Sequence, residues 1–239
     1  MRVNKYIAES GLCSRREADE LLQAGRVMIN EEVVGMGAKA LDGDVVKVDG
    51  EVVVARTVAP ESAKNRGVYI ALNKPVGITC TTDTTVDGNI VDFVDHPQRI
   101  FPIGRLDKDS EGLILLTSNG DIVNEILRAE NHHEKEYLVA VNKAVTDEFL
   151  SGMARGVRIH NQMTKPCKVR KIAKFGFAIT LTQGLNRQIR LMAAAFGYRV
   201  TQLRRVRIIN VKLGHLKPGQ WRNLTEAELK GLLPERTRW

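Results

Sequence analysis

A short stretch of the chain, residues 104–117, changes from glycine-flanked charged residues to a continuous apolar run (GRLDKDSEGLILLT). The apolar run 113–116 is too short to form a helix on its own, so it predicts a buried β-strand. The charged residues before it then lie in a loop at the end of a rigid strand. Because a rigid scaffold holds functional loop residues in a fixed position, Asp107 is the first candidate for a catalytic carboxylate.

Length and composition indicate a globular protein of one large domain or two unequal ones. The chain has 239 residues, and 43% of them are hydrophobic, which is enough for a sizeable core. No stretch approaches the roughly 18 apolar residues of a membrane helix, and the first residues lack the apolar segment of a signal peptide. The three cysteines, Cys13, Cys80 and Cys167, are far apart and odd in number. They indicate reduced thiols in a cytoplasmic protein rather than a disulfide framework or a zinc site.

The net charge of +8 is distributed unevenly along the chain. Residues 1–60 carry 8 Lys and Arg against 10 Asp and Glu, and residues 61–152 carry 9 against 15. Residues 153–239 carry 19 against 3, so this last third is strongly basic. Such a density of positive charge attracts a polyanion, most simply the backbone of a nucleic acid. The alternative is a solvated basic surface without a partner.

Residues 1–56 predict a small module of two helices and a few short strands. Residues 3–10 have a helical pattern, and Ser14 with Glu17 forms the capping-box signal of a second helix. The pair Asp49-Gly50 stands between two valine-rich segments and is a strong hairpin signal.

Arginines at the start of the second predicted helix make this module a candidate for phosphate binding. Free backbone N–H groups and the helix dipole favour an anion there, close to Arg15 and Arg16. Ordinary surface charge would explain the same arginines. The basic residues expected on one RNA-binding face are Arg2, Lys5, Arg15, Arg16 and Arg26.

The polar segment 57–66 (TVAPESAKNR) lacks periodicity and predicts a linker. Residues 67–239 then form a larger domain, with strand patterns that include 135–141 and helix patterns that include 187–196. These elements predict an α+β domain with a mixed, mainly antiparallel sheet. It contains no GxxxxGK[ST] or GxGxxG motif and no recognisable Ser/His/Asp set, so nucleotide-binding and serine-hydrolase folds are not indicated.

The larger domain offers few residues with distinctive chemistry besides Asp107. Tyr137 lies on the more apolar face of strand 135–141, so it is either a core residue or an aromatic platform for a nucleobase. Arg187 and Arg190 are three apart at the start of a helix and share a face. The pair His132-His133 has no matching ligand set around it, and no metal site is expected.

Four motifs of the larger domain, together with the N-terminal module, resemble a known family. The motifs are NKPVG (73–77), GRLDKDSEGL (104–113), KEYLV (135–139) and GLNRQIRLM (184–192). They resemble those of the RsuA-type ribosomal RNA pseudouridine synthases, and the chain is most similar to the F type of the large-subunit (23S) branch. Residues 1–56 resemble the S4 RNA-binding domain, which in that family docks on structured RNA.

The resemblance implies roles for individual residues. Asp107 matches the catalytic aspartate, and Tyr137 matches the tyrosine that stacks on the target uracil. Arg190 matches the arginine that pairs with the aspartate, and Arg105 matches the one that fills the RNA stack when the uridine leaves it. Further expected RNA contacts in this domain are Lys74, Asn186, Arg187, Arg204 and Arg205.

The implied activity is the isomerisation of a uridine to pseudouridine in 23S ribosomal RNA by a cytoplasmic monomer, with a transfer RNA as a second candidate substrate. Because this reaction needs no redox step and no metal, the resemblance implies no cofactor. Whether Asp107 attacks the base, attacks C1′ or stabilises charge stays open. Two other functions compete: a non-catalytic RNA-binding or ribosome-assembly protein, and a glycosidase-like enzyme that uses Asp107 with Asp109 or Glu111.

Overall fold

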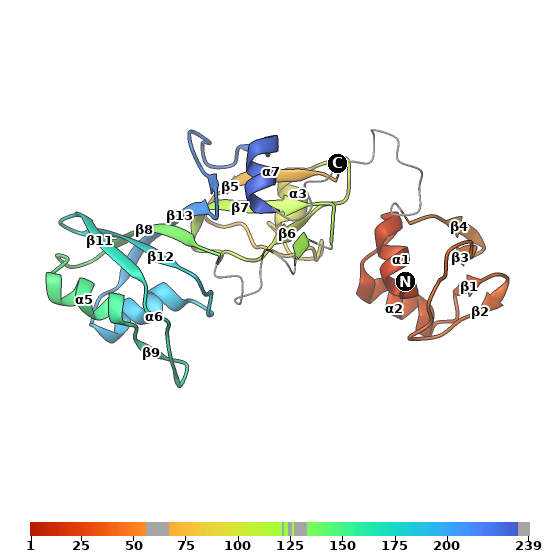
Figure 1. Ribbon diagram of the computed structural model, residues 1–239, viewed down its shortest axis with the longest axis horizontal. Coiled ribbons are helices and arrows are strands. Elements are labelled where there is room, and N and C mark those ends of the chain that lie inside the picture. Colours follow the sequence, from red (N-terminus) through yellow and green to blue (C-terminus); the bar gives the residue numbers. More distant parts are fainter. Residues whose placement is uncertain (56–66, 121, 124–125, 127–132, 234–239) are drawn as a thin grey trace. The chain divides into compact units, whose positions relative to one another are not determined.

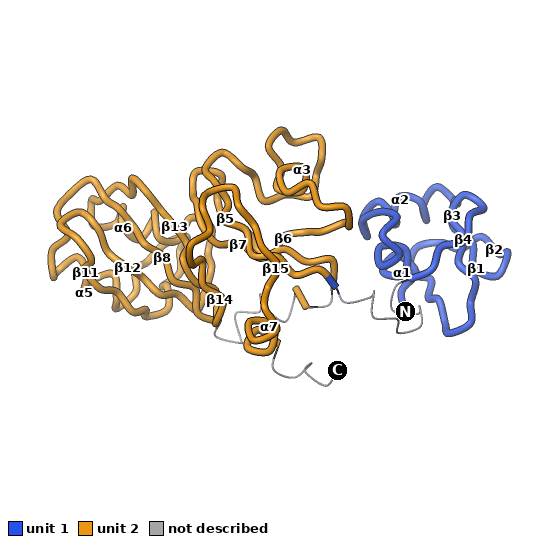
Figure 2. Tube along the Cα trace, turned by 90° about the horizontal axis from the view of Figure 1, so that it is seen from above, with its two compact units in different colours: residues 1–67 blue, residues 68–239 orange. Residues whose placement is uncertain are grey.

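A computed structural model of the chain describes residues 1–55, 67–120, 122–123, 126 and 133–233 (Figure 1). The chain separates into two compact units, Met1–Gly67 and Val68–Trp239 (Figure 2). The predicted linker, residues 57–66, lies outside the described residues. Within the described part of the chain, no helix is long and apolar enough to cross a membrane.

The N-terminal unit packs two helices on a small antiparallel sheet with strand order β2-β1-β3-β4. The predicted capping box is present: Ser14 accepts a hydrogen bond from the Glu17 N–H, and the Glu17 carboxylate accepts one from the Ser14 N–H. The predicted turn at Asp49-Gly50 joins β3 to β4. The elements are α1 (Val3–Ser10), α2 (Arg15–Gln23), β1 (Val27–Ile29), β2 (Glu32–Val33), β3 (Val46–Val48) and β4 (Glu51–Val53).

The second unit is built on a large sheet whose main path runs β11-β12-β8-β13-β7-β5-β15. Strand β13 pairs with β7 in parallel, and the other pairs are antiparallel, so the predicted mixed, mainly antiparallel sheet is confirmed. The strands are β5 (Tyr69–Lys74), β6 (Phe101–Ile103), β7 (Glu111–Thr117), β8 (Lys135–Val141), β11 (Lys168–Ala173), β12 (Gly176–Leu181), β13 (Val200–Ile208), β14 (Val211–Lys212) and β15 (Trp221–Asn223). A separate hairpin consists of β9 (Arg158–Ile159) and β10 (Gln162–Met163).

Helices cover this sheet in two places (Figure 1). Helices α5 (Asp147–Arg155) and α6 (Gln188–Ala195) pack on the apolar face of β8, β12 and β13, where Phe149 meets Phe177. Helices α3 (Ile90–Val94) and α7 (Glu226–Leu232) pack beside β5 and β7. Helix α5 is absent from the predicted elements, although Thr146 caps it by accepting a hydrogen bond from the Phe149 N–H.

The strand predicted at residues 113–116 is the buried centre of β7. Leu113 and Leu115 belong to one apolar cluster, and Ile114 and Leu116 belong to another. Both faces of the strand are therefore covered, which explains why its sequence is uninterruptedly apolar rather than alternating. Strand β7 is thus a rigid support for the charged loop that precedes it.

An ion pair at the start of the last helix predicts how the stability of the second unit changes with pH. Arg222 donates hydrogen bonds of 2.7 and 2.6 Å to the two carboxylate oxygens of Glu228, which also forms a capping box with Thr225, the N-cap residue of α7. The Arg222 hydrogen bond lowers the pKa of Glu228 from 4.5 to about 2. Because the pKa is lower in the folded state, this stabilisation is complete above pH 4.5 and is lost as the pH falls towards 2.

We expect Glu228→Gln to lower the stability of the second unit by about 1–2 kcal/mol at pH 7, since the pair is partly screened by solvent. The difference from the wild type should shrink as the pH approaches 2, where the natural carboxylate takes up its proton. Thermal unfolding followed by tryptophan fluorescence measures this, because Trp221 lies in β15 of this unit, next to Arg222. A difference that is independent of pH would contradict the assignment.

Candidate active site

The loop between β6 and β7 holds Asp107 by backbone hydrogen bonds. The Ser110 N–H donates to the carbonyl of Asp107 at 3.0 Å, which closes a tight turn around the intervening residues. The Gly77 N–H, from the turn that follows β5, donates to the carbonyl of Lys108 at 2.8 Å. Two chain segments therefore fix the position of the loop, and the Asp107 side chain stays partly exposed.

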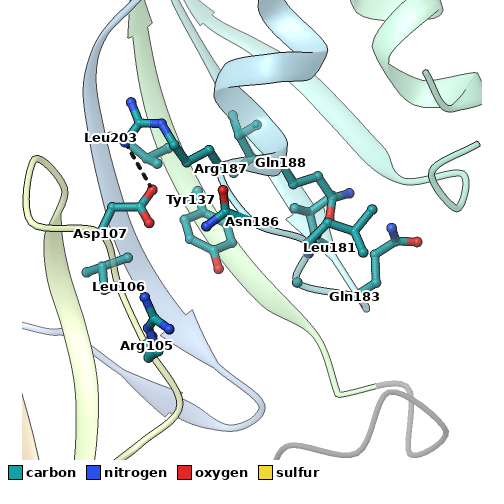
Figure 3. Close-up of a pocket in the computed structure, with 13 residues that line it drawn as sticks. Arg105, Leu106, Asp107, Tyr137, Leu181, Gln183, Asn186, Arg187, Gln188 and Leu203 are labelled. Atoms are coloured by element: carbon teal, nitrogen blue, oxygen red, sulfur yellow. Dashed lines mark hydrogen bonds and ion pairs between the residues drawn. The ribbon is translucent and has the colours of Figure 1, made fainter. Parts of the chain in front are cut away.

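Asp107 opens onto a cavity of about 320 Å³. Figure 3 shows Asp107 and Arg105 on one side of it, Asn186 and Gln188 on the other, and the Tyr137 ring between them. Leu181 and Leu203 add apolar wall. The labelled lining residues are Arg105, Leu106, Asp107, Tyr137, Leu181, Gln183, Asn186, Arg187, Gln188 and Leu203.

Arg187 is the arginine that faces Asp107. Its Nη1 lies 3.8 Å from Oδ2 of Asp107, as the dashed line in Figure 3 marks. The same guanidinium donates two hydrogen bonds, of 3.2 and 3.1 Å, to the carboxylate of Asp109. Arg187 is the N-cap residue of α6 and has a left-handed backbone (φ 49°), so it lies outside the helix proper. It therefore bridges two carboxylates of the loop.

Arg190 does not pair with Asp107, which corrects the expectation from the resemblance. Its Nη2 lies 3.3 Å from Oδ2 of Asp109 and donates to the Asp109 carbonyl and to the Ser110 hydroxyl, both at 3.0 Å. Burial raises the pKa of Asp109, but the hydrogen bond from Arg187 and the charges of both arginines outweigh it, so the net pKa is lowered. Arg190 therefore anchors the loop, and the Asp109 carboxylate forms ion pairs with both Arg187 and Arg190.

Arg205 is buried next to the site and is not exposed at its surface. It is the direct cross-strand partner of Tyr137, and its side chain is nearly buried, with 3% of the residue exposed. Its Nε donates to the carbonyl of Leu113 at 2.7 Å, its Nη1 donates to that of Arg105 at 3.4 Å, and its Cζ lies 6.0 Å from the centre of the Tyr137 ring. The prediction that Arg205 contacts RNA is therefore wrong, since its guanidinium ties β7, the loop and Tyr137 together.

The prediction that Lys74 contacts RNA is also wrong. Lys74 is fully buried, and its ammonium donates hydrogen bonds of 2.9 Å to the carbonyls of Pro75 and Ile78. Burial lowers the pKa of Lys74, against the opposing effects of Cys80 and Asp107. A side chain with no exposed surface cannot contact RNA, and Lys74 instead closes the turn that supports the loop of Asp107.

The other predicted contacts remain predictions. In the second unit, Arg105 and Asn186 are exposed at the cavity, and Arg204 pairs with Glu111 at 3.5 Å. In the N-terminal unit, Arg2, Arg15 and Arg16 are exposed, Lys5 pairs with Glu9 at 3.3 Å, and Arg26 pairs with Asp49 at 2.6 Å.

A second cavity, of about 490 Å³, adjoins the first and was not predicted. It shares Arg105, Leu106, Asp107 and Arg187 with the first cavity and is completed by the turn after β5. The NKPVG motif was the signal that could have indicated it, because the motif places a glycine turn with an exposed valine beside the loop. The residues added here are Val76, Gly77, Thr79, Cys80, Lys108 and Asp109.

Comparisons with known proteins agree with this arrangement. Residues 68–195 match the family model described as RNA pseudouridylate synthase, and residues 1–46 match that of the S4 domain. The chain is 58% identical to a dual-specificity RNA pseudouridine synthase RluF of Salmonella typhi, over 95% of this chain and 77% of that protein. It is 56% identical to the protein of the same name from Escherichia coli K12, over 96% and 77%. A solved structure titled as a pseudouridylate synthase is similar with a TM-score of 0.69 and 31% identity, covering 97% of this chain and 99% of that one.

Proposed function

Since the chain belongs to the RNA pseudouridine synthases, we propose that it isomerises a uridine of 23S ribosomal RNA and that Asp107 is its essential carboxylate. The observation that carries the proposal is the position of Asp107, whose carboxylate opens onto a cavity walled by the Tyr137 ring and lies 3.8 Å from the Arg187 guanidinium. A carboxylate, an aromatic ring and arginines are the groups that this reaction can use.

The reaction rearranges one nucleotide without adding or removing any other group. The bond between N1 of uracil and C1′ of the ribose breaks, the bond between C5 and C1′ forms, and the proton on C5 is replaced by one on N1. Electrons and atoms balance within the nucleotide. The proposal therefore includes no cofactor, and it assigns the steps to side chains of the cavity.

The cavity fits a base that has left the RNA stack. Tyr137 offers an aromatic face, and stacking on such a face stabilises an extruded base without reading its sequence. Extrusion costs about a few kcal/mol. Arg105 is exposed at the mouth of the cavity, so we propose that it fills the gap left in the RNA and offsets part of that cost.

Asp107 would act at the anomeric carbon or at the base, and either role requires a carboxylate held in one orientation. The turn closed by Ser110 and the charge of Arg187 supply that orientation. The buried Arg205 packs beside Tyr137, its cross-strand partner, and so helps to hold the aromatic wall in place. Preorganised groups of this kind lower a barrier because they need no rearrangement during the reaction.

The RNA class is proposed from charge and from the relatives. Residues 153–239 carry 19 Lys and Arg against 3 Asp and Glu, and such an excess of positive charge attracts a polyanion. The relatives at 56–58% identity are named dual-specificity RNA pseudouridine synthases, which supports a second RNA substrate, and we propose a transfer RNA for it. A monomer in the cytoplasm remains our prediction.

A glycosidase-like mechanism is disfavoured by the pairing of the other acids. Such an enzyme needs a second carboxylate that acts with Asp107. Asp109 is held by Arg187 and Arg190, and Glu111 is paired with Arg204.

Mapping pseudouridines in RNA from cells that lack this protein tests the substrate. We expect one or more uridines in 23S ribosomal RNA to lose the modification and to regain it when the wild-type gene is restored. The Asp107→Asn gene should fail to restore it, while Asp109→Asn, which changes a neighbouring carboxylate, should succeed. If every site of the 23S RNA stays modified in the deletion strain, the assignment to that RNA is wrong.

A further inference from the structure

The second cavity adjoins the proposed uridine site but has a different character. Its unshared part is formed by the turn after β5, where Val76 is 61% exposed and Gly77 adopts φ +96°. No atom lies within 4 Å of the position that a Cβ of Gly77 would take, so this wall presents bare backbone to open space. An aliphatic side chain beside bare backbone makes a flat, partly apolar surface that suits a planar ring.

Cations lie on the shared side of this cavity. Arg105 and Arg187 line both cavities, and Lys108 lines the second one. Lys108 is exposed and has no ion pair among the residues that the structure describes. A phosphate joining occupants of the two cavities would meet these positive charges, which contribute the salt-dependent part of binding to RNA.

The turn is held rigidly, so Val76 is presented in one place. Lys74 donates to the carbonyls of Pro75 and Ile78 on either side of it, and the Gly77 N–H donates to the carbonyl of Lys108. A single exposed valine is ordinary on a protein surface and carries no argument by itself. Here it is fixed by a buried lysine and attached to the loop of Asp107, at the edge of a cavity that continues into the uridine site.

We propose that this second cavity binds the base of a nucleotide adjacent to the target uridine, with Val76 and Gly77 as its apolar wall and Lys108 close to the connecting phosphate. The proposal rests on the proposed function, because it takes the first cavity as the uridine site. Neighbouring nucleotides are joined by one phosphodiester, and the two cavities share residues 105–107 as a common wall. The enzyme would then hold the RNA at two adjacent points, which fixes the register of the target.

A double comparison of protein and RNA tests this. The substrate is a stem-loop built around a mapped target uridine, with either an intact base or an abasic ribose on its 5′ or 3′ side. Val76→Ala should lower kcat/KM on the intact RNA by about five- to tenfold, since two methyl groups leave the contact. An abasic ribose on one side should cause a similar loss, and Val76→Ala should then add less than about twofold. The matched control is Val52→Ala, an exposed valine of β4 with 57% exposure that lines neither cavity.

A second measurement separates this proposal from the function itself. The fluorescence of 2-aminopurine, placed on either side of the uridine, reports base docking without turnover. We expect a change on binding at one of the two positions, and its loss in Val76→Asp. Failure of the wild type to convert the stem-loop while the fluorescence change persists would count against the proposed function alone. The proposed subsite would be contradicted if Val76→Ala and the abasic ribose lowered kcat/KM independently of each other. It would also be contradicted if the fluorescence changed at neither position.

Discussion

Replacing Asp107 by asparagine is expected to lower the rate of pseudouridine formation by at least about a thousandfold. The amide has the shape of the carboxylate but neither its charge nor its nucleophilicity. The turn around it should survive, because the Ser110 N–H donates to the backbone carbonyl of residue 107 and not to its side chain. Tritium release from RNA labelled at C5 of uridine measures the activity, and thermal unfolding checks the fold.

The neighbouring carboxylate gives a matched control. Asp109→Asn weakens the ion pairs with Arg187 and Arg190, yet Arg190 keeps its hydrogen bonds to the Asp109 carbonyl and the Ser110 hydroxyl. The loop should therefore stay in place, and we expect activity within about tenfold of the wild type. Turnover by Asp107→Asn at a rate similar to Asp109→Asn would favour a non-catalytic role for Asp107 and would revive the reading of the chain as an RNA-binding protein.

The hydrophobic pattern of the sequence predicted the strands that carry the site residues better than it predicted the contacts between those residues. The short uninterrupted apolar run 113–116 predicts a buried strand, and in the structure both faces of that strand are covered. The alternation along 135–141 predicts that Tyr137 lies on the apolar face of its strand, where the structure has it. The two alternatives for Tyr137, a core residue or an aromatic platform, are compatible in the structure, since it is 8% exposed and still lines the cavity.

The partners of the lysines and arginines around the site could not be predicted from the sequence. Lys74 and Arg205 were predicted to contact RNA, and charged side chains are indeed seldom buried in proteins. Both are buried with backbone carbonyls as their partners, and such partners leave no signature in the sequence. Helical spacing predicts that Arg187 and Arg190 share a face, but it does not tell which of them approaches Asp107. In the structure Arg187, which approaches Asp107, is the N-cap residue with a left-handed backbone rather than a residue of the helix. The parallel pairing of β13 with β7 could not be predicted from the sequence either. The order of strands in a sheet depends on tertiary packing, which the residues of the two strands do not encode on their own.

The glycine of the central motif explains how these buried groups fit together. Gly112 pairs with Arg205 across the parallel strands and has φ +110°, a conformation that side chains rarely adopt. A Cβ built on Gly112 would lie 2.6 Å from the backbone nitrogen of Arg205 and closer still to its carbonyl oxygen. The close approach of β7 to β13 therefore requires a glycine, and it brings the Arg205 guanidinium under Tyr137 and the loop.

Gly112→Ala is consequently expected to destabilise the second unit by at least about 3 kcal/mol, because backbone atoms rather than a flexible side chain must move. For a unit of this size, that corresponds to a fall in Tm of roughly 6–12 °C, followed by tryptophan fluorescence. Activity should fall with it, since Arg205 would shift together with the walls that it supports. Gly184→Ala is the matched control for stability: no atom lies within 4 Å of its Cβ position, and its backbone is not left-handed, so Tm should change little. A Gly112→Ala protein that unfolds within about 2 °C of the wild type would show that the two strands can separate at small cost, and Arg205 would then lose its role as the fixed support of Tyr137.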